Sequence, residues 1–184
     1  MTFGVAMRRI VLTFGLIAGA ILAAMMLITV PFQDRIPFDK AAVIGYTSMV
    51  LAFLMVFVGV KTYRDNVAGG RVTFGRAFTV GLLITMVASV CYVATWQVVY
   101  YKFMPDFAER YEAATIENAR QSGATDAQIA AKVKEAAEFK EMYRNPLVNI
   151  AFTLIEPLPV GLLFTLVSAA VLSRKRRVEG PAVA

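Results

Sequence analysis

The sequence predicts an all-α membrane protein, a four-helix transmembrane bundle with a helical hairpin between the third and fourth spans. Three observations carry this prediction. The 184 residues are 58% hydrophobic and 17% charged, against about 45–50% and about 25% in a typical globular domain. The chain contains four stretches of about 20 or more mostly apolar residues, enough to cross roughly 30 Å of hydrocarbon. Lysine and arginine gather on one side of these stretches, as in oriented membrane proteins.

The predicted spans cover residues 10–30, 41–60, 77–101 and 146–173. None of them alternates with a period of two, and each is far longer than a typical strand, so helices are expected. The first span follows two arginines and has to be compared with a signal peptide. Its 21 apolar residues exceed the roughly 7–15 of a signal sequence, so we expect it to remain as a span.

The positive residues predict the orientation. With the amino terminus in the cytoplasm, ten of the 19 lysines and arginines fall in inner segments, including the run Arg174–Arg177. Two fall in the first outer loop, and seven fall in segment 102–145, where eight acidic residues offset them. We therefore expect a multi-pass protein of the bacterial inner membrane with both termini in the cytoplasm. The net charge of +6 then needs no nucleic-acid partner.

Segment 102–145 is the one sizeable polar stretch, expected outside the cytoplasm. Its pattern predicts a helix over 106–121 and a second helix that begins after Thr125 and ends near Tyr143. Thr125 and Gln128 have the spacing of a capping box. Each helix carries an apolar stripe, which predicts a hairpin. The stripes are expected to pack on each other and on the spans, to lie in the membrane interface, or to meet a partner.

The composition excludes several kinds of chemistry. The chain has no histidine and one cysteine, Cys91, which excludes histidine-based catalysis, most zinc sites and an intrachain disulfide. The glycines of the loop at 61–76 lack the spacing of nucleotide-binding motifs. We therefore expect no cofactor and no metal, and we expect a protein that is not an enzyme.

Glu156 is the most informative polar residue. A carboxylate inside a span is costly, and such residues usually face a bundle interior or a wet cavity. Pro157 and Pro159 follow it and have no N–H, so the carbonyls of Thr153 and Ile155 lose their helical partners. The residue is expected either to hold the helix structure together or to form a protonatable or ligand-binding site.

Four further side chains are expected near Glu156. Counting residues from the outer end of each span, at about 1.5 Å per residue, places them at a similar depth. They are Tyr46, Tyr92, Trp96 and Gln97. Tyrosine and tryptophan near a span end are also typical of an interfacial belt. The sequence thus predicts a candidate intramembrane polar site whose role stays open.

Short motifs resemble a bacterial family of four-span membrane proteins known only as a domain of unknown function. These motifs are Tyr63-Arg64-Asp65, Gly69-Gly70, the run 73–78 with Val80-Gly81-Leu82, and the run 166–172. The resemblance covers most of the chain and is weakest over the hairpin. It implies the same topology in a bacterial inner membrane, and it implies no activity, substrate or catalytic residue.

Three functions remain open from the sequence. The first is an accessory protein that acts by association, with a membrane-protein partner or a second copy of the chain. The second is a small oligomeric transporter or proton-coupled permease centred on Glu156, with a dimer formed through Gly15 and Gly19 of the first span. The third is a membrane-embedded enzyme acting on lipid. The lipid bilayer is the expected surrounding of all three.

Overall fold

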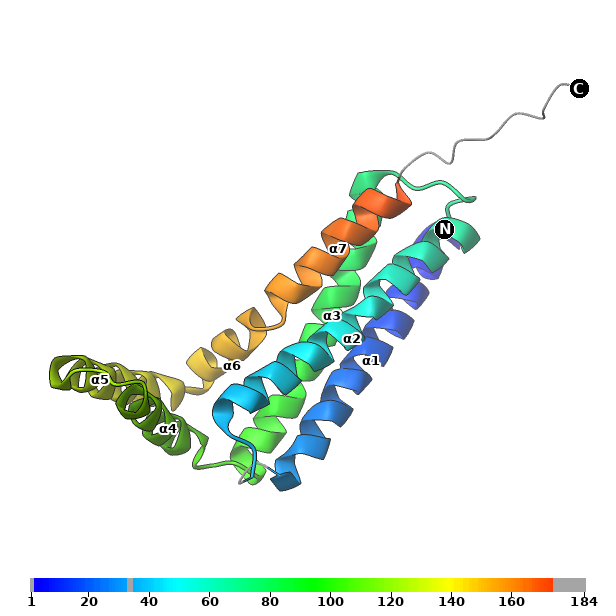
Figure 1. Cartoon of the computed structure of the whole chain (residues 1–184). Coiled ribbons are helices and arrows are strands. Elements are labelled where there is room, and N and C mark those ends of the chain that lie inside the picture. The colour runs from blue at the N-terminus through cyan, green and yellow to red at the C-terminus, as the bar shows by residue number, and fades with distance from the viewer. Residues whose placement is uncertain (1, 33–34, 174–184) are drawn as a thin grey trace, which may run out of the picture.

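Four long apolar segments form a helical bundle. The computed structural model describes residues 2–32 and 35–173, and every regular element in these residues is a helix. The segments long and apolar enough to cross a membrane are Gly4–Phe32, Lys40–Asn66, Phe74–Lys102 and Pro146–Leu172. They run side by side, with the hairpin projecting from one end (Figure 1). The predicted four-helix membrane bundle is confirmed.

The first three spans are continuous helices. α1 covers Thr2–Thr29 and ends in the 3₁₀ turn η1 (Val30–Phe32), while α2 covers Phe38–Asn66 and α3 covers Phe74–Lys102. Each helix extends beyond its predicted apolar stretch, because helical hydrogen bonding continues into flanking polar residues. The run Arg174–Arg177, expected to end the fourth span, lies outside the described residues.

The fourth span is two helices, which corrects the prediction of one. α6 covers Pro146–Ile155 and α7 covers Leu158–Leu172, and the break falls at Glu156 and Pro157. The physical reason is the missing N–H of two nearby prolines, which interrupts the hydrogen-bond ladder. Hydropathy is insensitive to this interruption, because the residues on both sides are apolar.

The glycines of α1 let it approach α3 closely. A methyl group at Gly15 would lie 2.6 Å from Cβ of Val87, and one at Gly19 would lie 2.5 Å from Cβ of Cys91. Such small residues allow close packing of membrane helices. Because α3 covers this stripe within the same chain, the small residues serve close packing between helices, which is the usual role of such a stripe, and they are not free for the dimer contact of the transporter hypothesis.

α3 also packs tightly against α7 and α2. The Thr85 hydroxyl lies 3.2 Å from that of Thr165 and donates a longer hydrogen bond of 3.4 Å to the Gly161 carbonyl. Phe53 from α2 is fully buried in the same layer. Hydroxyl groups that bond across helices satisfy polar atoms that lipid cannot. The core of the bundle therefore lies between all four spans, with Val11, Ala18 and Leu22 of α1 buried beside these residues of α2, α3 and α7.

The polar segment forms the predicted hairpin. α4 covers Phe107–Gln121 and α5 covers Asp126–Tyr143, and they pack along each other. The capping box of Thr125 and Gln128 is present. Ion pairs join the two helices, with Lys140 Nζ 2.6 Å from Glu112 and Arg144 3.0 Å from Glu109. The hairpin is thus a folded unit attached to the end of the bundle where α3 ends.

The opposite end of the bundle has a short turn. Gly69 and Gly70, between α2 and α3, have φ values of 66° and 81°, which only glycine adopts without strain. The Thr73 hydroxyl accepts a hydrogen bond from the backbone N–H of Arg76 and so caps α3. The turn therefore has the backbone geometry that its two glycines allow, and α3 begins with a side-chain cap.

Candidate functional site

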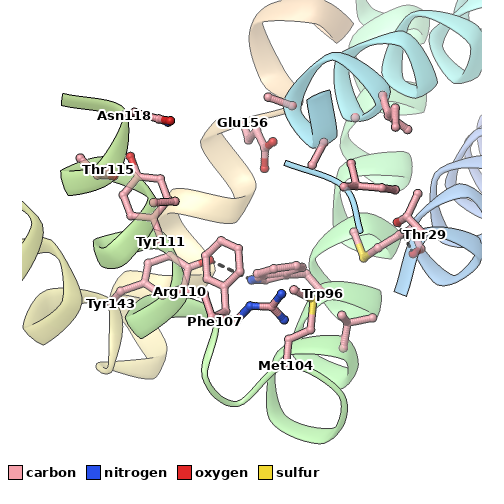
Figure 2. A pocket seen from close by; sticks show the side chains of 18 of the residues that line it. Thr29, Trp96, Met104, Phe107, Arg110, Tyr111, Thr115, Asn118, Tyr143 and Glu156 are labelled. Atoms are coloured by element: carbon pink, nitrogen blue, oxygen red, sulfur yellow. Dashed lines mark hydrogen bonds between the residues drawn. The ribbon is translucent and has the colours of Figure 1, made fainter. Parts of the chain in front are cut away.

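A pocket of about 1160 Å³ lies between the hairpin and the bundle. Its walls come from α1, α2, α3 and α4, with contributions from the start of α5 and from Glu156 at the break. Figure 2 shows the polar and aromatic side chains that face it. The pocket exists because the hairpin is directed sideways, away from the bundle axis, instead of folding back over the span ends (Figure 1).

Glu156 projects into this pocket (Figure 2). Its backbone N–H still bonds to the Phe152 carbonyl, so α6 ends at the residue itself. The Tyr92 hydroxyl donates a 2.9 Å hydrogen bond to Glu156 Oε2. Within the described part of the chain, no lysine or arginine lies within 4 Å of the carboxylate. The carboxylate therefore has a hydrogen-bond donor and no cationic partner from those residues.

Trp96 joins the pocket to the hairpin. Its indole Nε1–H donates a 2.9 Å hydrogen bond to the Tyr143 hydroxyl, and its ring centroid lies 4.9 Å from that of Phe107 in an edge-to-face arrangement. Burial raises the pKa of Tyr143 above its ordinary value. Such an aromatic pair adds about 0.5–1.5 kcal/mol beyond its buried area. Trp96 is thus both a pocket wall and an anchor for the hairpin.

A chain of aromatic rings continues from this anchor along the hairpin. Phe139 lies at its centre, with ring centroids 5.0 Å from both Tyr111 and Tyr143 and 5.8 Å from Phe152 of α6. Rings from α3, α4, α5 and α6 therefore meet in one cluster. The expectation that the apolar stripes pack on each other and on the spans is confirmed.

Two of the predicted site residues lie elsewhere. Gln97 donates a 2.7 Å hydrogen bond to Asn149 Oδ1 and joins α3 to α6 outside the pocket. The Asn149 side chain is fully buried, and its Nδ2 has no hydrogen-bond partner among the residues that the structure describes. Tyr46 is 51% exposed and does not line the pocket, although Gly45 and Ser48 do. Glu156, Tyr92 and Trp96 therefore line one pocket, and Gln97 and Tyr46 do not line it.

The pocket also contains residues that the sequence analysis did not select. Arg110 of α4 lines it, together with Phe107 and Tyr111 of the same helix. Phe107 and Tyr111 belong to the apolar stripe of the first hairpin helix, which was expected to pack on the second helix and the spans, to lie in the membrane interface or to meet a partner. Arg110 is three residues from Phe107, so it shares that face of the helix. The spacing between Phe107 and Arg110 could be read from the sequence. The direction in which the hairpin leaves the bundle could not.

Comparison with known proteins places the chain in one protein family. The family model described as "Protein of unknown function (DUF4199)" matches residues 13–174. The chain belongs to this family. The DUF4199 match includes all four spans and the hairpin, the segment over which the sequence resemblance was weakest. No curated protein and no solved structure matches the chain. Membership of an uncharacterised family with four membrane-span-like helices is therefore confirmed, and the DUF4199 description itself assigns no activity.

Proposed function

We propose that this protein is a non-enzymatic membrane protein that acts by association, with the α4–α5 hairpin as the element that meets its partner. The observation that carries the proposal is the placement of the hairpin. Aromatic contacts hold one end of it on α3 and α6, and the turn that joins α4 to α5 points away from the bundle (Figure 1). The partner is a membrane protein or a second copy of this chain.

The surface of the hairpin supports this role. Val133 and Met142 of α5 are 39% and 49% exposed, although both are apolar. The ion pairs between α4 and α5 stabilise the hairpin internally and leave these side chains at the surface. Interfaces typically combine a few apolar anchors with a polar rim. A preformed helix pair can present such anchors without a large ordering cost.

The absence of an enzymatic role rests on the sequence. A chain without histidine lacks the residue that most often acts as a general acid or base, and its single cysteine is the one thiol that could act as a nucleophile. Within the spans, the carboxylate of Glu156 remains as one candidate proton carrier. A hydrolytic or group-transfer reaction usually needs more catalytic groups than one carboxylate.

The proposed location is the bacterial inner membrane, with both termini in the cytoplasm and the hairpin outside. The support is the distribution of positive residues. Arg8 and Arg9 precede the apolar part of α1, and Lys61, Arg64, Arg71 and Arg76 surround the turn between α2 and α3. These positions lie at the end of the bundle opposite to the hairpin (Figure 1). Excess lysine and arginine in short loops is typical of the cytoplasmic side.

Crosslinking from defined positions tests the association. A photoreactive residue at Val133 or at Met142 is expected to give the same defined adduct in intact membranes. The matched control is Leu83, an exposed side chain of α3 far from the hairpin, which is expected not to give that adduct. A chain that remains monomeric and gives no adduct from either hairpin position contradicts the proposal.

A second candidate function is a small transporter or permease centred on Glu156. The observation that favours it is the broken span, because transporter sites often lie where a membrane helix is interrupted. The carboxylate faces the pocket beside Tyr92, as a proton or cation carrier requires. Four spans are few for a complete pathway, so an oligomer is needed, formed by surfaces other than the covered stripe of α1. Unchanged flux and growth in Glu156→Gln would remove this candidate.

A further inference from the structure

The pocket wall formed by α1 and α2 is apolar. Leu22, Met25 and Met26 of α1 and Ile44 of α2 line it, together with Gly45. All of them lie within candidate membrane spans. The space of about 1160 Å³ is too large to stay empty, and its wall along α1 and α2 offers water few hydrogen bonds. The hydrocarbon chains of the surrounding bilayer are the chemical match for such a wall.

The pocket also has polar groups away from the α1 and α2 wall, and these groups lie at two different depths in the membrane. Arg110 follows the end of α3 in the chain, so it lies near the level at which the bundle leaves the hydrocarbon. Tyr92 and Glu156 lie deeper, because Tyr92 precedes the last residue of α3 by ten residues, about 15 Å at helical rise. Figure 2 shows Arg110 and Glu156 on different sides of the pocket, with Trp96 near Arg110.

This order of groups matches the order of groups in a phospholipid. A guanidinium suits a phosphate, because its N–H groups donate charge-assisted hydrogen bonds in a planar fork. The deeper hydroxyl and carboxyl groups suit the ester region, and the apolar wall suits the acyl chains. The pocket is also larger than the roughly 300–1,000 Å³ of typical small-molecule sites.

We propose that the pocket between the hairpin and the spans is a binding site for one phospholipid of the bilayer. Its phosphate lies at Arg110, its ester groups lie beside Tyr92 and Glu156, and its acyl chains lie along α1 and α2. The site is independent of the proposed partner surface, because Val133 and Met142 do not line the pocket. Loss of lipid binding and loss of partner adducts are therefore distinguishable results.

The chain contains the reporter for a direct test. Trp96 is the single tryptophan, and it lines the pocket. Its fluorescence is measured in the purified full-length protein as phospholipid with brominated acyl chains is added, because bromine quenches tryptophan on close approach. We expect saturable quenching that unbrominated phospholipid reverses. A wild-type protein whose Trp96 is not quenched in this way overturns the proposal and indicates that protein fills the pocket.

A substitution that fills the pocket separates this site from the general lipid shell. Gly45 lines the pocket, and a Cβ added there meets nothing within 4 Å, so Gly45→Leu extends into open space. Gly75→Leu is the matched control, since Gly75 is equally open and does not line the pocket. We expect quenching to fall by about half or more in Gly45→Leu, because leucine excludes acyl chain from the volume that it occupies. Equal quenching in Gly45→Leu, Gly75→Leu and wild type overturns the proposal, because it reports surrounding lipid alone.

The head-group contact has its own test. Arg110→Gln is expected to weaken binding of the brominated phospholipid about tenfold, as expected for loss of a charge-assisted contact. Arg120→Gln on the same helix is the control, because Arg120 is exposed and does not line the pocket. Brominated diacylglycerol, which lacks the phosphate, is expected to bind both variants and the wild type equally. Inorganic phosphate distinguishes a free anion site, and competition by it at millimolar concentration contradicts a lipid site.

Discussion

Gln97 of α3 donates a 2.7 Å hydrogen bond to the side-chain carbonyl of Asn149 in α6. The pair lies on the hairpin side of the helix break, while Thr85 and Gly161 meet on the other side. The number of residues between Thr85 and Gln97 in α3 equals the number between Asn149 and Gly161 in the last span, which runs in the opposite direction. The register between the two helices is therefore kept across the break.

Separate replacement of Gln97 and Asn149 by leucine is expected to lower the thermal stability of the protein in detergent. Gln97→Leu leaves the buried Asn149 side chain without its partner, at a cost of about 1–3 kcal/mol, and Asn149→Leu leaves the half-buried Gln97 without one, at a smaller cost. The double replacement removes both groups and is expected to cost less than the sum. Melting temperatures of the four proteins form a double-mutant cycle. Strict additivity would contradict coupling between the two side chains.

Gly161→Val is expected to destabilise the bundle by about 1–3 kcal/mol or more, because added atoms must displace neighbours in a packed layer. A Cβ at this position would meet Phe53 Cζ at 3.1 Å and would lie still closer to Thr85. Gly45→Ala is the control, since its Cβ would meet nothing within 4 Å. Thermal unfolding followed by circular dichroism measures both. Equal melting temperatures of the two variants would show that α3 and α7 are not closely packed.

Thr125→Ala is expected to weaken α5 by about 1 kcal/mol, the usual cost of losing an N-cap. The Thr125 hydroxyl accepts from the Gln128 N–H, and the Gln128 side chain bonds back to the Thr125 N–H. Thr125→Ser, which keeps the hydroxyl, is the control. Amide hydrogen exchange at the start of α5 measures the effect, and unchanged protection in Thr125→Ala would contradict it.

Acid is expected to loosen the hairpin. A hydrogen bond from its own backbone N–H, followed by one from Arg144, lowers the pKa of Glu109 below the ordinary value of 4.5. A carboxyl group whose pKa is lower in the folded state stabilises that state above the unfolded pKa. This contribution is lost as pH falls through the lower, folded pKa.

The loss is small, within about 1 kcal/mol, because Glu109 and Arg144 are 44% and 53% exposed and solvent screens their charges. Amide hydrogen exchange in α4 and α5, compared between pH 5 and lower pH, measures this loss of stability. Glu109→Gln is expected to show lower protection at neutral pH and less dependence on acid. A variant as acid-sensitive as the wild type would assign the effect to other carboxylates.

The orientation can be measured with a single cysteine. In a Cys91→Ala background, a cysteine at Glu138, an exposed position of α5, is expected to react with a membrane-impermeant reagent in intact cells. A cysteine at Arg71 in the opposite turn is expected to react only after the cells are opened. The reverse result would invert the proposed topology.

The local features of the fold could be predicted from the sequence because their causes are local. The capping box at Thr125 depends on two side chains three residues apart, and the turn at Gly69 and Gly70 depends on glycine's freedom at positive φ. The ends of the spans follow from length and charge. Hydrophobicity and capping are therefore sufficient for the order of the elements, and the break of the last span at Pro157 is the element boundary that they miss.

The candidate site was predicted only in part, because the sequence gives the depth of each side chain in the membrane but not the direction in which it points. Tyr46 was placed by counting residues along α2, and counting gives the level of a side chain without its direction around the helix axis. Arg110 was missed because its position depends on the angle at which α4 leaves α3. That angle is set by contacts among Trp96, Phe107 and Tyr143, which are distant in sequence.

The interruption at Pro157 divides the last span into two helices, α6 and α7, that meet at a joint. α6 continues directly from the hairpin and contacts α5, whereas α7 is packed into the core against α2 and α3. α6 also contacts α3 through the hydrogen bond from Gln97 to Asn149, and Trp96 holds the hairpin on α3. A change of angle at the joint would therefore have to break these contacts before α6 and the hairpin could move while α7 stays in place. Because Glu156 lies at the joint and the hairpin forms the far wall, the same contacts keep the width of the space between them.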